Sequence, residues 1–375
     1  MSLRIIEVVG KADLDRYIRL PSVLPDRRPN YVPPIWSDER TFHDSAKNPD
    51  LRACDVVRYL AWSDGRAVGR IMGIVHHPYN ALHGERTARF YQLDCVNGPT
   101  VASALLKAVE RWAIEQGMDR IIGPFGTSDK DPQGLQVEGF EHLPVLATPT
   151  NPAYLPGLVE AEGYTKLMDA VVYQLAIPNE LPAVYVRISG RLLNSGRFRL
   201  LSFTSKRQLK PWIVPVLRLV NDTYQDLLGF VPMDEAGMRK LAGQYLPVLD
   251  PAFVKVVVNE QDLPVAFVVA MPDMSAGIQR AKGKLLPFGW WYIMQAMRRS
   301  KQLDLFLGAV RRDLQGRGLT GVLAVHLMTE ARKRGFTVMD SHLVLETNLR
   351  MRAELERLGG AIRKRYRIYQ KAIQA

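Results

Sequence analysis

Cysteine is scarce in this chain, since Cys54 and Cys95 are the only two in 375 residues. Two cysteines do not make a disulfide framework, so the sequence indicates a reducing compartment. Long apolar runs are also missing, because no segment reaches the roughly 20 apolar residues that a membrane-spanning helix needs. The apolar run near the first residue is too short for a secretory signal. We therefore expect a cytoplasmic protein with no membrane partner, in which the apolar segment 285–297 lines a core or a cleft.

Acidic residues are outnumbered by basic ones, 38 to 50, which gives a net charge of +12. A positive balance attracts nucleic acid, acidic lipid or a phosphorylated small molecule. Part of the excess lies in the segment RKRYRIYQK at 363–371. Its alternation of side chains also fits a strand with one solvated face. Nucleic acid thus stays open as a partner without being favoured.

Metal-ligand spacing is absent from the seven histidines. The adjacent pair His76 and His77 does not by itself make a ligand set. We expect no metal. An apolar content of 47% with 23% charged residues is typical of a globular protein, and the length suffices for two domains.

The order of predicted elements repeats along the chain. Each half runs through adjoining strands, a further strand, a long helix, a strand, a short helix and a last strand. The match is clearest where VERWAIEQGMDRIIG and LMTEARKRGFTVMDS both place a glycine at a helix end directly before a strand. We infer two similar domains joined near residues 177–183.

The stretch VRRDLQGRGLT, Val310 to Thr320, joins an apolar run of strand length to a long helical pattern. Backbone amides and the dipole at a helix N-terminus favour an anion, and glycines let a phosphate approach them. A plain connecting turn is the alternative. Gly316, Gly318 and Gly321 also have the spacing of a dinucleotide fingerprint, with Asp340 as its acidic residue.

The first half enters its corresponding helix through CVNGPTVAS, where Gly98 stands alone before Pro99. Proline suits the first helical turn, but it removes one amide that an anion would use. We therefore expect a phosphate site in the second half only.

Val310 followed by Gln315-Gly316-Arg317-Gly318-Leu319 resembles the signature of the GNAT superfamily of acyl-CoA N-acyltransferases. The segments VPPIWSDERTFHDSAKNP, LPFGW and KRYRIYQK are similar to those of a bacterial two-domain GNAT-like group. The resemblance implies an α/β (α+β) protein of two tandem domains, 1–178 and 179–375. Each would be a mixed, mostly antiparallel sheet flanked by helices, and the second would hold coenzyme A.

The resemblance also implies site residues. The backbone at Ala309 and Val310 would pair with the pantetheine arm of acetyl-CoA or another acyl-CoA. Thr320 departs from the small residue usual at its place. The pyrophosphate would be held by Gln315, Gly316, Arg317, Gly318, Leu319 and Thr320.

Glu346 is our candidate catalytic base or amine-orienting group, and Asn348 resembles the asparagine that opens the next helix near the coenzyme. As an alternative, Thr347 and Asn348 cap a helix and Glu346 complements its dipole. Where many family members have a tyrosine acid, this chain has Leu355, and Tyr366 or Tyr369 would have to substitute.

The long irregular segment 125–152 is typical of a functional loop. Thr127, Ser128 and Asp129 are therefore candidate substrate contacts, as is Tyr224. Ordinary turn chemistry explains the first three equally well, and a core position explains Tyr224.

We predict an acyl-CoA-dependent N-acyltransferase, with acetyl as the expected acyl group and a small-molecule or peptide amine as the acceptor. An aminoacyl-tRNA-dependent transferase of the duplicated GNAT-like type is one alternative. A non-catalytic module that binds coenzyme A or nucleic acid is the other.

Overall fold

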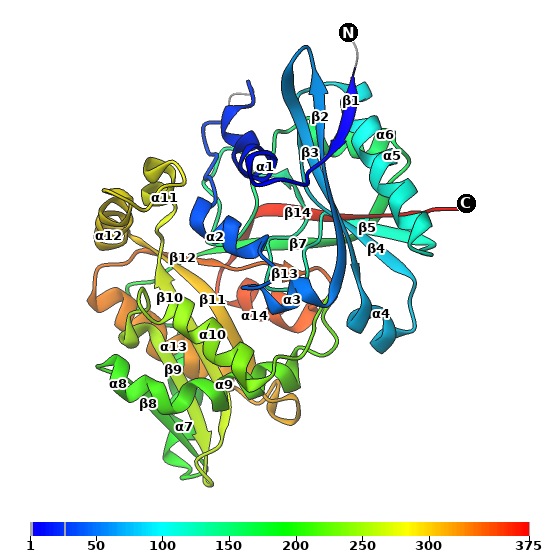
Figure 1. Ribbon diagram of the computed structural model, residues 1–375. Coiled ribbons are helices and arrows are strands. Elements are labelled where there is room, and N and C mark those ends of the chain that lie inside the picture. Colours follow the sequence, from blue (N-terminus) through cyan, green and yellow to red (C-terminus); the bar gives the residue numbers. More distant parts are fainter. Residues whose placement is uncertain (1–2, 26–27, 375) are drawn as a thin grey trace. The chain divides into compact units, whose positions relative to one another are not determined.

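The computed structural model describes residues 3–25 and 28–374. The chain forms two compact units, each with its own strands and helices (Figure 1). Unit 1 comprises Met1–Val171, Met274–Ala296 and Arg363–Ala375, and unit 2 comprises Val172–Asp273 and Met297–Ile362.

The sheet of unit 1 has the strand order β1-β2-β3-β4-β5-β14-β7. Its neighbours are antiparallel from β1 to β4, whereas β4 and β5 are parallel. The β2-β3 hairpin turns at Asp64 and Gly65, both with positive φ. The strands are β1(Arg4–Glu7), β2(Cys54–Ser63), β3(Arg66–His76), β4(Thr87–Cys95), β5(Arg120–Gly123), β6(Leu135–Glu138), β7(Thr165–Ala176) and β14(Ala361–Ala372).

The helix α5(Pro99–Glu115) covers this sheet, because its apolar residues recur at helical spacing and face the strands. Leu105, Leu106 and Val109 are fully buried against Ile71 and Phe90 in the main core of the unit. The other helices of unit 1 are α1(Lys11–Val23), α2(Trp36–Phe42), α3(Pro49–Arg52), α4(His77–His83), α6(Leu155–Ala161), α11(Ser275–Ala281) and most of α12(Gly289–Arg299).

The sheet of unit 2 has the order β12-β11-β10-β9-β8, and the second half of β7 pairs with β12. Only β11 and β12 are parallel in this run. The strands are β8(Phe198–Ser202), β9(Val254–Asn259), β10(Pro264–Pro272), β11(Gln302–Val310), β12(Val338–Ser341) and β13(Val344–Leu345). The helices are α7(Ala183–Asn194), α8(Lys206–Leu209), α9(Ile213–Thr223), α10(Glu235–Tyr245), α13(Leu319–Lys333) and α14(Leu349–Arg357), with short 3-10 turns at Lys210–Trp212, Pro251–Phe253 and Arg312–Leu314.

The predicted duplication is confirmed. In unit 1 the helix α5 connects the parallel strands β4 and β5, and in unit 2 the helix α13 connects the parallel strands β11 and β12. The boundary expected near residue 178 remains a prediction. The compact units interleave along the chain, because β14 pairs with β5 and because Gln279 of α11 donates hydrogen bonds to the carbonyls of Pro29 and Tyr31.

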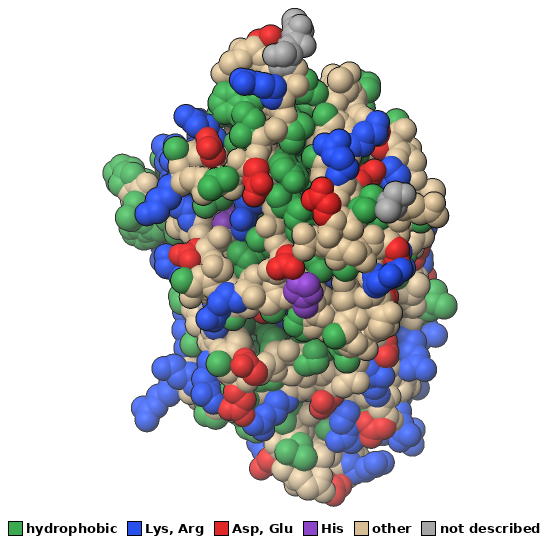
Figure 2. All heavy atoms as spheres, turned by 45° about the vertical axis from the view of Figure 1, so that its right-hand side comes forward, with side chains coloured by type: hydrophobic (Ala, Val, Ile, Leu, Met, Phe, Trp, Pro, Cys, Tyr) green, Lys and Arg blue, Asp and Glu red, His purple; other side chains and the backbone are tan. Residues whose placement is uncertain are grey.

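Basic and acidic side chains are interspersed on the face of the molecule in Figure 2. The basic segment at 363–371 is part of β14, and its Lys364, Tyr366 and Ile368 are buried. Arg367 of the opposite face forms an ion pair with Asp169 at 2.9 Å. The interpretation of this segment as a strand is therefore confirmed.

His76 ends β3 and caps α4, since its Nδ1 accepts a hydrogen bond from the Tyr79 amide at 3.1 Å. His77 instead contacts Asp55, with 2.8 Å between Nε2 and Oδ2. Neither histidine belongs to a metal-binding group, and none was found among the described residues. No helix in residues 3–25 or 28–374 has the length and apolar character to cross a membrane.

The buried His76 makes the stability of unit 1 depend on pH. Burial, with a smaller effect of the Arg89 guanidinium, lowers the pKa of His76 to about 4. An unfolded histidine has a pKa of about 6.5 and therefore takes up a proton before the folded one does. The free energy of unfolding should fall by up to about 2 kcal/mol as the pH drops from 7 to 5.

The His76→Asn variant keeps a good cap but does not titrate. Urea melts at pH 7 and pH 5 give the free energy of unfolding of each protein. Between pH 7 and pH 5 this free energy should fall by up to about 2 kcal/mol less in the variant than in the wild type. An equal loss in both proteins would contradict the assignment.

Candidate functional site

The strands β11 and β12 part within the sheet of unit 2. They pair from Gln302 and Val338 to Leu305 and Ser341, and β11 then continues to Val310 with β10 as its strand neighbour. The register between β10 and β11 shifts at Phe306, which forms a bulge. One backbone edge of β11 beyond Leu305 is therefore left without a strand partner, and this edge includes Ala309 and Val310.

The predicted glycine turn lies where β11 leads into α13. Gly316 and Gly318 have φ values of 74° and 90°, which favour glycine. No atom lies within 4 Å of a Cβ built on Gly316, whereas one on Gly318 would lie 2.7 Å from Ile188 of α7. Gly318 thus permits close packing of α7, and Gly316 faces open space.

The amides around these glycines suit an anion. The first N–H groups of α13, at Leu319 and Thr320, have no carbonyl partner within the helix. Arg317 is exposed on the turn. The geometry matches the predicted phosphate site, although the binding of a phosphate there stays a prediction.

Gln315 links the turn to α14. Its Nε2 donates to the Val310 carbonyl at 3.1 Å, and its Oε1 accepts from Arg350 Nη1 at 2.8 Å. The exposed Arg350 therefore lies beside the glycine turn and adds a positive charge to it. The sequence did not indicate this residue, because Arg350 stands 35 positions after Gln315 and no motif joins them.

Asn348 caps α14, since its Oδ1 accepts a hydrogen bond from the Met351 amide at 3.2 Å. Glu346 is half-buried in the turn between β13 and α14, and its carbonyl accepts from Arg352 Nη1 at 3.2 Å. The capping interpretation is confirmed for Asn348. The catalytic roles of Glu346 and Asn348 and the coenzyme contact of Asn348 remain predictions.

Arg352 also joins this turn to β7. Its Nε donates to the Tyr173 hydroxyl at 3.1 Å, and that hydroxyl donates to Glu356 Oε1 at 2.6 Å. The Tyr173 amide in turn donates to the side chain of Ser341, at the end of β12. Because 179 residues separate Tyr173 from Arg352, no local pattern in the sequence points to this contact.

Tyr224 lies at the end of α9 and donates its hydroxyl to the Gly308 carbonyl at 2.9 Å. Gly308 belongs to the part of β11 that β12 does not pair. The structure thus brings Tyr224 to the strand expected to hold the pantetheine arm, and its contact with a substrate stays a prediction.

An apolar cavity of about 100 Å³ lies between α9, α10 and the sheet of unit 2. Phe306 and Leu307 of β11 form part of its wall, so the cavity adjoins the bulged part of that strand. The lining side chains are all apolar or aromatic: Leu209, Trp212, Ile213, Val216, Leu217, Leu241, Ala242, Tyr245, Leu246, Leu249, Val254, Val256, Val269, Phe306 and Leu307.

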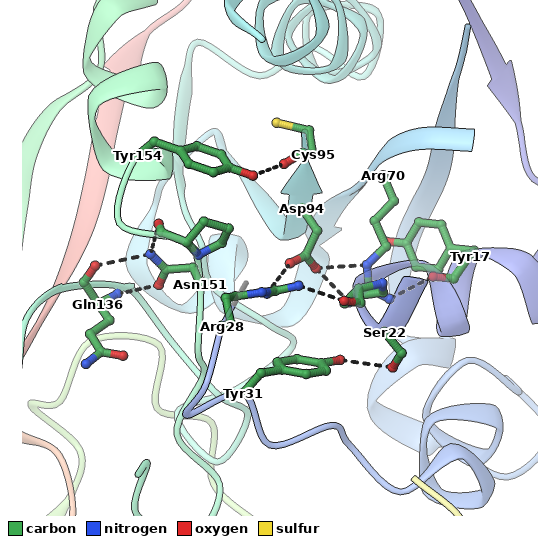
Figure 3. A network of polar contacts seen from close by, with 12 residues as sticks. Tyr17, Ser22, Arg28, Tyr31, Arg70, Asp94, Cys95, Gln136, Asn151 and Tyr154 are labelled. Carbon is green, nitrogen blue, oxygen red and sulfur yellow. Dashed lines mark hydrogen bonds and ion pairs between the residues drawn. The ribbon is translucent and has the colours of Figure 1, made fainter. Parts of the chain in front are cut away.

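Unit 1 has a different turn at the corresponding place. Gly98 has an extended φ of −151° and is followed by Pro99, the first residue of α5. Tyr154 donates its hydroxyl to the Cys95 carbonyl at 2.8 Å, at the end of β4 (Figure 3). The Val310 carbonyl at the end of β11 likewise accepts from a side chain, Gln315, so the difference between the units lies at the start of the helix. The absence of a coenzyme site from this unit stays a prediction.

The loop after β5 is held by Asp131. Its Oδ2 accepts from the hydroxyl and the amide of Thr127, each at 2.7 Å, and from the Ser128 amide at 3.2 Å. Asp129 forms an ion pair with Lys130 at 3.0 Å. These contacts are the turn chemistry that the sequence left as the alternative. Substrate contacts of Thr127, Ser128 and Asp129 remain predictions.

A buried ionic network joins α1 to the sheet of unit 1. Arg70 donates to Asp94 at 2.9 and 3.0 Å and to the Tyr17 carbonyl at 2.9 Å (Figure 3). Arg28 approaches the other oxygen of Asp94 at 3.5 Å. The buried Arg70 guanidinium thus links α1 to β3 and β4, because it contacts Asp94 and the Tyr17 carbonyl at the same time.

Asp340 does not have the position of a ribose-binding residue. It lies within β12, buried, and accepts from Gln174 Nε2 at 2.8 Å. The sheet is also mostly antiparallel, unlike that of the dinucleotide-binding fold. The dinucleotide alternative is therefore excluded.

Comparisons with known proteins give two relatives of full length. The chain is 30% identical to Protein YghO of Escherichia coli over 385 residues, which cover 97% of this chain and 94% of that protein. It is 29% identical to the bacterial ceramide synthase of Caulobacter vibrioides over 379 residues, which cover 99% and 98%. No family model matches the chain.

Among solved structures, the chain is similar to a tandem GNAT protein from the clavulanic acid biosynthesis pathway. The TM-score is 0.54 at 14% identity, with 100% of this chain and 99% of the other covered. The tandem GNAT fold implied by the sequence is thereby confirmed for the whole chain.

The open space at Gly316 allows a test of coenzyme binding. Asp and Asn both tolerate a positive φ, and they differ in charge but hardly in size. A carboxylate among the turn amides would repel a pyrophosphate, so Gly316→Asp should weaken coenzyme A binding at least about tenfold relative to Gly316→Asn. Calorimetric titration with coenzyme A measures both affinities. Equal affinities in the two variants would show that the phosphates bind elsewhere.

Proposed function

Because the chain belongs to the protein family of YghO and has the tandem fold of the GNAT acyltransferases, we propose that it is an acyl-CoA-dependent N-acyltransferase. Its coenzyme site lies in unit 2. The observation that supports this most directly is the glycine turn, which presents free helix amides and the exposed Arg317 beside the unpaired edge of β11.

The coenzyme would lie along β11 in this proposal. Its pyrophosphate contacts the turn from Gln315 to Thr320, and the pantetheine arm pairs with the backbone at Ala309 and Val310. The thioester then lies near Phe306, where β11 and β12 part. Arg350 supplies a further positive charge for the phosphates.

The reaction joins an amine to the acyl carbonyl. The neutral amine attacks the thioester carbon, the carbon–sulfur bond breaks, and the coenzyme leaves as a thiol while an amide forms. One proton must leave the amine during the attack. Glu346, on the turn after β13, is the proposed acceptor of that proton or the group that orients the amine.

The cavity beside Phe306 favours an acyl group longer than the acetyl group expected from the sequence. An apolar cavity of about 150 Å³ admits benzene, so one of about 100 Å³ has room for roughly four carbon atoms. Its wall is almost entirely apolar, which suits a hydrocarbon chain better than a hydrated end. We propose that the first methylene groups of a fatty acyl chain occupy it.

The acceptor is proposed to be the amine of a long-chain amino alcohol. The support is the similarity over the whole chain to a protein named as a ceramide synthase, since a ceramide is the fatty amide of such an amine.

The assay measures free thiol released from acyl-CoAs of 2 to about 16 carbons, with long-chain amino alcohols, short amines and peptides as acceptors. Thiol release that depends on an amine, with an amide as product, supports the proposal. Absence of turnover with every pair, together with tight and salt-tolerant tRNA binding, would support an aminoacyl-tRNA-dependent transferase instead.

Glu346 should affect the chemical step more than coenzyme binding. Glu346→Gln keeps the size of the side chain but removes the proton acceptor, so kcat should fall roughly 10²–10⁴-fold. The affinity for coenzyme A should stay nearly constant. Glu354→Gln, on the neighbouring helix α14, is the control. Near-normal turnover of Glu346→Gln would leave this residue with a structural role at the helix start.

Chain-length preference tests the cavity. Ile213 lines it, whereas the adjacent Val214 is half-buried to the same degree and does not. Ile213→Trp should fill the cavity and lower kcat/KM for octanoyl-CoA at least about tenfold relative to acetyl-CoA, since each buried methylene contributes about 0.8 kcal/mol. Val214→Trp should leave that ratio unchanged. If the ratio is unchanged in both variants, the acyl chain binds outside this cavity.

A further inference from the structure

The segment from α11 to α12 exposes large apolar side chains to solvent. Leu286, Phe288, Trp290 and Trp291 are 78%, 63%, 54% and 44% exposed. Leu285 and Met294 are exposed as well. The expectation that 285–297 lines a core or a cleft is therefore wrong for most of these side chains. Only Ile293 and Met297, one helical turn apart, are buried beneath α12.

These side chains are held on a well-packed hairpin. A Cβ on Gly277 of α11 would lie 2.6 Å from the backbone of Ile293, so α11 and α12 touch directly. The Trp36 amide donates to the Gly283 carbonyl at 2.9 Å, and Ser275 donates to the Pro144 carbonyl at 2.7 Å. The hairpin is thus fixed to unit 1, and its exposed apolar side chains are presented by an ordered backbone.

The charge pattern around this hairpin differs from that of the rest of the chain. Between Asp273 and Asp304 the sequence has no acidic residue. The basic residues there are Arg280, Lys282, Lys284, Arg298, Arg299 and Lys301. Five of these side chains are exposed on or next to the two helices: Arg280, Lys282, Lys284, Arg298 and Arg299.

Lys301 is exposed too and lies two residues after the end of α12. A stretch with six positive charges and no negative charge, around exposed tryptophan, phenylalanine and leucine, matches the interface of an anionic bilayer. A protein partner of mixed charge would not need that segregation. The Trp290 indole N–H already donates to the Pro287 carbonyl at 3.0 Å, so the ring can enter an apolar layer without losing a hydrogen bond to water.

We propose that the hairpin surface Arg280–Met294 docks on an anionic lipid bilayer, with Leu286, Phe288, Trp290 and Trp291 in the acyl boundary and Arg280, Lys282 and Lys284 at the lipid phosphates. This reverses the expectation of no membrane partner. Docking at the surface needs no membrane-spanning helix. The inference concerns binding and does not depend on acyl transfer, so the two can fail separately.

The experiment is co-sedimentation of the full chain with vesicles of phosphatidylcholine alone or with about 30% phosphatidylglycerol, an anionic lipid. The wild type should bind the anionic vesicles at least about tenfold more tightly than the neutral ones and lose affinity with added salt. The double variant Leu286→Ser with Phe288→Ser should lose at least about tenfold in affinity.

The matched control is Leu82→Ser with Leu263→Ser, which removes side chains that are 65% and 57% exposed outside the hairpin. It should bind like the wild type. Thermal melts of both double variants verify folding, and a blue shift of tryptophan fluorescence that Trp290→Phe with Trp291→Phe removes gives a second readout. No vesicle binding by the wild type, or equal binding by both double variants, overturns the proposal. The proposal is also overturned if the wild type is a dimer and the hairpin double variant alone is a monomer, because a second copy of the chain then covers this surface.

Discussion

The parting of β11 from β12 beyond Leu305 and Ser341 is the constraint on which the candidate site of unit 2 depends. A fully paired sheet would leave no backbone edge for a ligand and would close the path from the glycine turn to the cavity. The bulge at Phe306 and the contact between Tyr224 and Gly308 both occur in this part of β11. Turn, strand edge and cavity wall therefore follow one another along a single strand and the helix after it.

Unit 1 has a corresponding order of strands, but its residues at the end of β4 and the start of α5 differ from those at the end of β11 and the start of α13. Tyr154 occupies the carbonyl at the end of β4, and Pro99 takes the place of an amide donor at the start of α5. The buried Arg70 pairs with Asp94 and also donates to the Tyr17 carbonyl, which links α1 to the sheet. Because the Val310 carbonyl at the end of β11 also accepts from a side chain, the two copies differ at the first helical residue: Pro99 has no N–H, whereas Leu319 of α13 has one.

The sequence predicted those helices, strands and turns that neighbouring residues determine. The turn at Gly316 and Gly318 and the duplication were predicted and confirmed. Helical periodicity and the backbone freedom of glycine are properties of short segments, so the sequence shows them directly. Contacts such as Gln315 with Arg350 were missed, since only the folded chain brings them together. The exposed aromatic hairpin was misjudged because apolar composition does not reveal which side of a helix faces water. The roles of Glu346 and Thr127 remain predictions.

The place of β14 between β5 and β7 has a consequence for the order of folding during synthesis. The sheet of unit 1 is complete only when the last strand of the chain pairs with β5, although most of unit 1 is made first. At roughly 5–20 residues per second, the strand β5 waits on the order of 10–50 s for its partner. During that interval the unpaired edge of β5 can pair with strands of other chains. A chaperone that binds nascent chains would therefore be needed mainly for the first half of the protein, although that half is synthesised first.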